Sequence, residues 1–138
     1  MEQTGVPSGP MVAPAAVFPS AKSRERVLQD AEGWVRRGLV DMVFPMTYDD
    51  SDAGFRDVID EGYSLFRAGG AQAVCFPGVG VYKHKTADQT LKQISMCRSG
   101  FAAFSYSSFY VSPDETRKEN EKLCRARRDS LRRLLAAR

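Results

Sequence analysis

Short apolar runs alternate with amphipathic stretches along this chain. The runs cover residues 11–18, 39–46, 71–76 and 101–106, and each is followed by apolar residues at the three- and four-residue spacing of a helix. This order predicts four strand–helix units. Continuous apolar strands joined by helices are typical of a parallel sheet covered on both faces, so we expect an α/β fold with four βα units and right-handed crossovers.

The first two amphipathic stretches predict one helix each. Between Ser20 and Gly38, the apolar face of a single helix is formed by Val27, Ala31, Trp34 and Val35. We expect Trp34 to pack in the core, because it shares that face. The second helix carries a longer apolar stripe and ends at residues 69–70. Its stripe consists of Phe55, Val58, Ile59, Tyr63 and Phe66.

Capping signals mark the start of the two later helices. Thr86 and Gln89 have capping-box spacing ahead of the third helix. Ser112, Pro113 and Glu115 provide a cap, a proline at the first helical position and a capping-box acid ahead of a charged terminal helix.

Length and composition indicate one soluble globular domain. The chain has 138 residues, of which 43% are hydrophobic and 27% are charged. Residues 1–10 are rich in Gly, Pro and Ser and predict an irregular lead-in to a domain spanning 11–138. No window approaches eighteen consecutive apolar residues, and the N-terminus lacks the features of a secretory signal. We therefore expect no membrane span.

The few cysteines and the single histidine limit the chemistry. Cys75, Cys97 and Cys124 have no CxxC spacing, which argues against a disulfide framework or a zinc site. His84 is the only histidine, so metal chemistry and a Ser/His/Asp triad are disfavoured. It lies between two lysines in an expected loop, where we expect it to be solvated. We expect neither a metal nor another cofactor.

The carboxyl ends of parallel strands form the functional face of such folds. Three groups of polar residues follow the second, third and fourth strands: Tyr48, Asp49 and Asp50; Tyr82, Lys83 and His84; Ser105, Tyr106, Ser107 and Ser108. The segment "GVGVYK" lacks the third glycine and the Lys-Ser/Thr pair of a phosphate loop, so its glycines are expected to permit tight turns.

Several spaced segments resemble the closing part of the glycosyl hydrolase-like 10 family. They are "WVRRGLVDMVFPMTYDD", "GVGVYK", a helix bearing Gln93 and Ile94, and "GFAAFSYSSF". That family comprises bacterial proteins with a (β/α)8 barrel, and the match covers roughly 12–109, about the last half of such a barrel. Relatives of this kind are usually exported, so the resemblance leaves the localisation of this chain open.

The segment "MTYD" is also similar to the sixth-strand motif of family 18 chitinases, in which tyrosine and aspartate hold the N-acetyl group of the sugar. The resemblance implies that Tyr48 and Asp49 contact a sugar, and that Tyr82 and Tyr106 line the cleft. The expected ligand is a carbohydrate, for example an N-acetylated glycan such as peptidoglycan.

Hydrolysis needs more than these residues supply. Most glycosidases use two carboxyl groups roughly 5 to 9.5 Å apart. Asp49 and Asp50 are neighbours on an extended segment and point to opposite faces, so they do not form that pair. Asp49 could orient the sugar's acetamide in a substrate-assisted route, whereas the acid would come from an earlier strand of the barrel. Alternatively, either aspartate caps the following helix.

Four βα units leave open sheet edges. The chain is therefore expected to be a fragment of a longer protein, half of a dimeric barrel, or a small open sheet, and we favour the fragment. Our hypothesis is the C-terminal part of a glycoside hydrolase-like barrel, inactive or nearly so in isolation. The alternative is a non-catalytic carbohydrate-binding remnant.

A third hypothesis, an interaction module, rests on the charged tail. From Asp114 onward, nine Lys/Arg and five Asp/Glu give a net charge of +4. Acids alternate with the bases, no aromatic residue accompanies them, and several leucines are spaced to pack: Leu123, Leu131, Leu134 and Leu135. A packed, solvated helix is therefore favoured over nucleic-acid binding.

Overall fold

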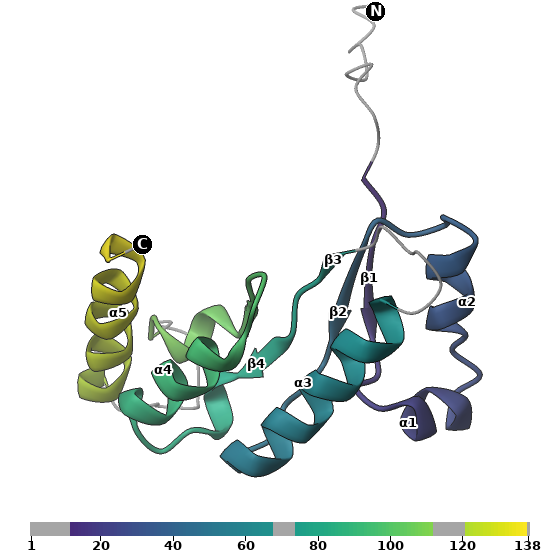
Figure 1. The fold of residues 1–138 in the computed structure, drawn as a ribbon. Helices are drawn as coiled ribbons and strands as arrows, with labels where there is room; N and C mark the ends of the chain where they lie inside the picture. Colours follow the sequence, from purple (N-terminus) through teal and green to yellow (C-terminus); the bar gives the residue numbers. More distant parts are fainter. Residues whose placement is uncertain (1–11, 68–73, 112–120, 138) are drawn as a thin grey trace, which may run out of the picture.

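The computed structural model describes residues 12–67, 74–111 and 121–137. The elements in chain order are β1 (Pro14–Val17), α1 (Ala21–Arg26), α2 (Ala31–Arg36), β2 (Met42–Pro45), α3 (Asp52–Arg67), β3 (Val74–Cys75), β4 (Gly78–Gly80), the 3₁₀ turn η1 (Val81–Lys83), α4 (Ala87–Met96), β5 (Ala102–Phe104), the 3₁₀ turn η2 (Tyr106–Ser108) and α5 (Glu121–Ala136). They run from α1 and α2 at one end of the molecule to α5 at the other (Figure 1).

All strand pairs are parallel, which confirms the α/β class and the strand direction. One sheet has the order β1-β2-β3, with Ala15 opposite Val43 and Val43 opposite Cys75. A second sheet pairs β4 with β5. The third predicted strand is thus divided: β3 pairs with β2, and β4 pairs with β5. Pro77 lies between them and has no N–H to continue a ladder. Residues 78–80, expected as a loop, form a strand.

The three-stranded sheet is buried on one face only. Val17, Val43 and Cys75 are buried, whereas Val74 is 39% exposed. Phe44 is half-buried on the open face and stacks on Phe76, with ring centroids 5.6 Å apart. Helices α2 to α5 contact one another in succession, and α3 and α4 contact β3 and β4. Within the described residues, the expected coverage of both faces is therefore wrong.

The predicted helix between Ser20 and Gly38 is broken into α1 and α2. Leu28 adopts a left-handed φ of 55° and is 91% exposed, and Val27 is also exposed rather than packed. Asp30 caps the second helix, because its carboxylate accepts the Gly33 N–H at 3.0 Å. The helical spacing of apolar residues in the sequence therefore continues through the break between α1 and α2, where Asp30 starts a new helix. Trp34 packs against the core, as expected.

The helices that follow largely match their sequence signals. In α3, the stripe residues Phe55, Ile59 and Phe66 are buried, as predicted. Thr86 caps α4 by accepting the Gln89 N–H at 3.2 Å. The reciprocal half of the capping box is absent, because the Gln89 side chain accepts from the Lys85 N–H instead.

Helix α5 packs on α4 and is fixed by a buried arginine. Arg127 is 2% exposed and donates to the carbonyls of Val81, His84 and Ser108 at 3.1, 2.8 and 2.9 Å. Leu131 and Leu134 pack against the core, whereas Leu135 is 54% exposed. The capping signal at 112–115 lies outside the described residues. None of the helices seen in the described ranges combines the length and apolarity of a membrane span.

Candidate functional site

Three aromatic side chains from separate strand ends meet in one cluster. Tyr48 follows β2, Tyr82 lies in η1 directly after β4, and Phe104 ends β5. The ring of Tyr48 stacks on Phe104 with centroids 5.2 Å apart, and Tyr82 contacts both rings edge-on at 6.1 and 6.0 Å. We call this group the aromatic rim. Tyr82 and Phe104 are 43% and 51% exposed, so the cluster presents ring surface to solvent.

The glycines of β4 let this strand lie directly against Tyr48. A Cβ on Gly80 would stand 2.9 Å from the Tyr48 Cβ, and one on Gly78 would stand 3.0 Å from its Cε1 and 2.9 Å from the Pro45 carbonyl oxygen. Glycine in a strand often marks such a close backbone approach. The "GVG" segment therefore seats the Tyr48 ring, rather than forming the expected tight turns.

The Tyr48 phenol is half-buried and protonated at neutral pH. Desolvation raises the pKa of Tyr48 above its ordinary value of 10.0, and the neighbouring Tyr82 raises that pKa further. At neutral pH the hydroxyl is thus available as a hydrogen-bond donor. The rim combines apolar ring faces with phenolic donors, which suits a ligand that has both an apolar face and hydroxyl groups.

The Asp49 carboxylate engages the start of α3. Its Oδ1 accepts the Ser51 N–H at 2.7 Å, and a Cβ on Gly54 would come within 2.5 Å of its Oδ2. Asp49 thus forms a local turn before the helix, whereas the cap of α3 is Ser51, whose Oγ accepts the Gly54 N–H at 3.0 Å; the predicted capping by an aspartate is not seen. Asp50 follows it and is exposed. The orienting role of Asp49 stays a prediction.

Helix α4 holds the loop that carries Tyr48 and Asp49. The Gln93 amide donates to the Asp49 carbonyl at 3.0 Å, and Gln89, one turn earlier, donates to the Asp50 carbonyl. Gln93 is fully buried. Its side chain spans from α4 to the loop after β2, so the placement of the rim tyrosine depends on a polar contact inside the protein.

His84 extends this contact and is not solvated, contrary to the prediction. It is 3% exposed, its Nε2 lies 2.9 Å from Gln93 Oε1, and its Nδ1 lies 2.9 Å from Thr90 Oγ1. Because the Gln93 amide nitrogen donates to Asp49, its oxygen must accept, which assigns the proton to His84 Nε2. Burial lowers the pKa of His84. The polar spacing of Thr90 and Gln93 on one face of α4 was the available sequence signal.

Tyr106 does not join the rim. It is 74% exposed and stacks on Tyr110, with centroids 4.7 Å apart. The Ser105 hydroxyl is paired with that of Ser107 at 2.8 Å. Tyr106 instead borders a cavity of about 230 Å³ between η2 and α5, which we call the α5 pocket. It is lined by Tyr106, Phe109, Tyr110, Arg128, Leu131, Arg132 and Leu135.

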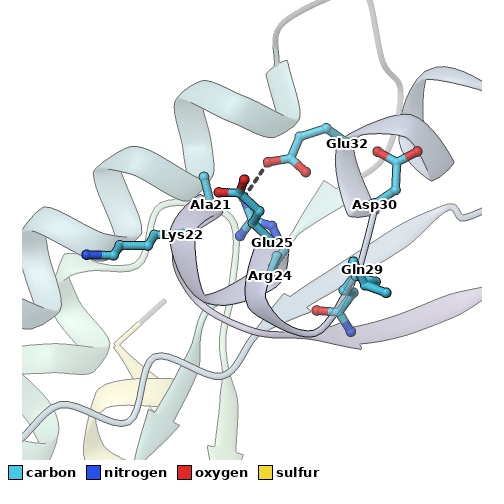
Figure 2. A pocket seen from close by; sticks show the side chains of 8 residues that line it. Ala21, Lys22, Arg24, Glu25, Gln29, Asp30 and Glu32 are labelled. Atoms are coloured by element: carbon cyan, nitrogen blue, oxygen red, sulfur yellow. Dashed lines mark hydrogen bonds and ion pairs between the residues drawn. The ribbon is translucent and has the colours of Figure 1, made fainter.

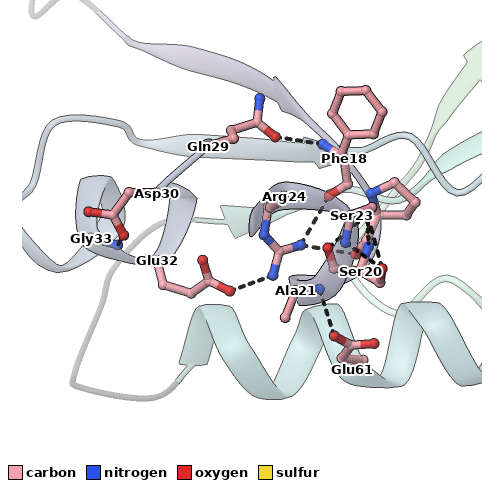
Figure 3. Close-up of polar contacts among 11 residues, drawn as sticks. Phe18, Ser20, Ala21, Ser23, Arg24, Gln29, Asp30, Glu32, Gly33 and Glu61 are labelled. Atoms are coloured by element: carbon pink, nitrogen blue, oxygen red, sulfur yellow. Dashed lines mark hydrogen bonds and ion pairs between the residues drawn. The ribbon is translucent and has the colours of Figure 1, made fainter. Parts of the chain in front are cut away.

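A larger depression lies elsewhere, between α1 and α2. Its volume is about 610 Å³. Figure 2 shows positively charged, negatively charged and amide side chains around it. Arg24 is 1% exposed and is already held by the Phe18 and Pro19 carbonyls, each at 3.0 Å, and by Glu32 (Figure 3). These contacts fix the turn after β1. We therefore place the candidate site at the aromatic rim and not at this larger depression.

The cysteines offer no reactive centre in this arrangement. Cys75, Cys97 and Cys124 are buried, and none of the three forms a disulfide. Burial raises the pKa of Cys75 to about 12, which keeps that thiol protonated and weakly nucleophilic. Across the described ranges, no group of three or more His, Cys, Asp and Glu side chains is arranged to hold a metal ion.

Comparison with protein-family models, curated proteins and solved structures gave no match to this chain.

Proposed function

We propose that this chain is the C-terminal part of a glycoside hydrolase-like (β/α) barrel and that its aromatic rim binds carbohydrate. The convergence of Tyr48, Tyr82 and Phe104 carries the proposal. The three rings come from separate parallel-strand ends and lie within 6.1 Å of one another. Their position after the carboxyl ends of the strands is the usual site position in α/β folds.

A sugar ring suits this surface chemically. One face of a pyranose carries mainly C–H groups, which can pack on an exposed aromatic ring, while its hydroxyls need hydrogen-bond partners. Tyr82 and Phe104 provide half-exposed ring surface, and the protonated Tyr48 provides a phenolic O–H. The "MTYD" resemblance adds an N-acetylated glycan as the expected substrate class.

The isolated chain is proposed to bind glycan without turning it over. The only carboxylates directly after Tyr48 are those of Asp49 and Asp50, and that of Asp49 accepts the Ser51 N–H. Glycoside hydrolysis also needs a protonated acid placed near the leaving oxygen. In the proposed barrel, that acid belongs to a strand outside these four βα units. A non-catalytic carbohydrate-binding remnant would share the same rim.

The open face of the three-stranded sheet leaves room for the missing half of the proposed barrel. An eight-stranded barrel needs four further βα units, which a second copy of this chain or an N-terminal half would supply. Light scattering after size exclusion separates these sources. A mass of twice 15.3 kDa supports a dimer of halves, whereas a mass of 15.3 kDa contradicts the dimer and leaves an N-terminal half or a small open sheet.

Calorimetric titration with N-acetylglucosamine oligomers tests the binding site. We expect Tyr82→Ala and Tyr48→Ala to weaken binding at least tenfold. Phe18→Ala is the matched control, because Phe18 is 40% exposed, as Tyr82 is at 43%, and lies outside both the rim and the α5 pocket. Equal affinities for wild type and both rim variants would contradict the proposal. Turnover that Asp49→Asn abolishes would show instead that this chain is an enzyme by itself.

A further inference from the structure

We propose that the α5 pocket binds the carboxylate-bearing residue of an acidic glycan. The inference deepens the proposed function and rests on it, since it adds a second sugar subsite beyond the aromatic rim. Tyr106, expected beside Tyr48, instead borders a separate cavity that two arginines also line.

The pocket has an aromatic wall and an apolar base. Tyr106 and Tyr110 stack face to face with an angle of 17° between their planes, so one ring supports the other in this wall. Phe109 is 7% exposed, and Leu131 packs against the core from α5. Leu135, 54% exposed, stands at the margin. A ligand with one apolar face can thus be covered from the tyrosine side.

Two arginines give the pocket its charge. Arg128 lies over the Tyr110 ring at 4.8 Å from the centroid and also donates to the Phe109 carbonyl. Arg132 is largely exposed, and its nearest described carboxylate is Asp129, at 3.7 Å. An exposed pair of this kind contributes little, so Arg132 can turn to a ligand anion at small cost. The guanidinium group is well suited to a carboxylate because it binds two oxygens at once.

The two walls are held together before any ligand arrives. Arg127 of α5 donates to the Ser108 carbonyl, at the end of η2, at 2.9 Å. The same side chain donates to the Val81 and His84 carbonyls, so it fixes α5 to the turn that follows β4 as well. A preformed pocket loses less conformational entropy on binding.

The volume of the pocket and the positive charge of α5 indicate which class of ligand fits. At about 230 Å³ the pocket is smaller than the ~300–1,000 Å³ typical of sites for drug-sized ligands, which suits a single ring. Helix α5 carries six Lys/Arg and two Asp/Glu between residues 121 and 136, a net charge of +4. An anionic ring with an apolar face fits both features, and a sugar acid has this chemistry.

A matched pair of monosaccharides tests the inference. N-acetylmuramic acid differs from N-acetylglucosamine by one carboxylate-bearing ether substituent. By calorimetry or NMR titration, we expect the acid to bind about tenfold tighter, the size of one charge-assisted hydrogen bond. Arg132→Gln should remove that preference. Arg133→Gln should retain it, because Arg133 is an exposed neighbour that does not line the pocket.

Each result has a separate meaning. Equal affinity for the two sugars, or a preference that survives Arg132→Gln, would overturn the acidic subsite while leaving the rim proposal intact. A Tyr106→Ala variant that keeps full acid affinity would also overturn it. Loss of neutral oligomer binding in Tyr82→Ala tests the rim independently. Equally tight binding of single-stranded DNA would show that α5 attracts any polyanion, which again contradicts the inference.

Discussion

Replacing Gln93 with leucine tests whether the contact between α4 and the Tyr48 loop stabilises the fold. The change introduces an apolar side chain of similar volume and removes both the amide oxygen and the amide nitrogen. His84 Nε2–H then loses its acceptor, and the Asp49 carbonyl loses its donor, at distances that are now 2.9 and 3.0 Å. An unsatisfied buried polar group costs about 1–3 kcal/mol. Two such groups predict a loss of about 2–6 kcal/mol in the free energy of unfolding.

Gln89→Leu is the matched control. Gln89 lies one turn earlier on the same helix and donates to the adjacent carbonyl, that of Asp50, but it is partly exposed. Water can replace its hydrogen bond, so we expect a loss of less than about 1 kcal/mol. The assay is urea unfolding followed by far-UV circular dichroism, with the denaturant slope compared between variants. Equal losses for the two glutamines would refute the buried network. Should Gln93→Leu fail to fold, Gln93→Asn provides a milder test with the same expected order.

Three further predictions concern other buried contacts. Burial lowers the pKa of His84, so its neutral form stabilises the fold fully above pH 6.5, the ordinary pKa. The free energy of unfolding should fall as the pH drops from 6.5 through the folded pKa. In acid unfolding curves, His84→Asn should reduce this dependence of stability on pH. Gly80→Ala should lower the free energy of unfolding by about 1–3 kcal/mol and weaken neutral glycan binding, because the new Cβ displaces Tyr48. Gly62→Ala is the control: its Cβ would lie 3.8 Å from the nearest atom, Cγ of Pro45, so it should leave the thermal unfolding midpoint unchanged or raise it. Arg24→Ala should cost about 3–5 kcal/mol in urea unfolding, and an unchanged midpoint would contradict a structural role for this buried ion pair.

The order of elements was predictable because it rests on local pattern. Short apolar runs alternate with amphipathic helices, and that alternation requires parallel pairing, which the register of β1, β2 and β3 shows. The division of the third strand has a local signal too, Pro77, but the change of partner from β2 to β5 depends on packing that one sequence does not display.

The site was predictable to the extent that strand ends determine it. Tyr48 follows β2 and Tyr82 follows β4, and although these strands belong to different sheets, the structure brings the two ring centroids to 6.1 Å. Phe104 was assigned to a strand interior, so its place on the rim was missed. Tyr106 is only two residues further on, but the η2 turn directs it to Tyr110. One or two residues of boundary error therefore change which aromatic side chain is expected to reach the rim.

The predictions for His84 and for the helix around Leu28 were wrong because of tertiary packing and helix capping. His84 was expected in water because lysines flank it, but its partners Thr90 and Gln93 come from α4 and bury it. The helix break at Leu28 follows from the Asp30 cap, a signal that the continuing apolar repeat concealed. In both cases capping or tertiary packing, rather than the local sequence pattern, determined the structure.

Mapping glycan binding residue by residue tests the central claim most directly. In ¹H–¹⁵N spectra titrated with a neutral N-acetylglucosamine oligomer, the account predicts saturable shifts concentrated at the amides of Tyr48, of residues 79–83 and of Phe104, and their loss in Tyr82→Ala. Shifts confined to the depression between α1 and α2, or none at millimolar glycan, would contradict it.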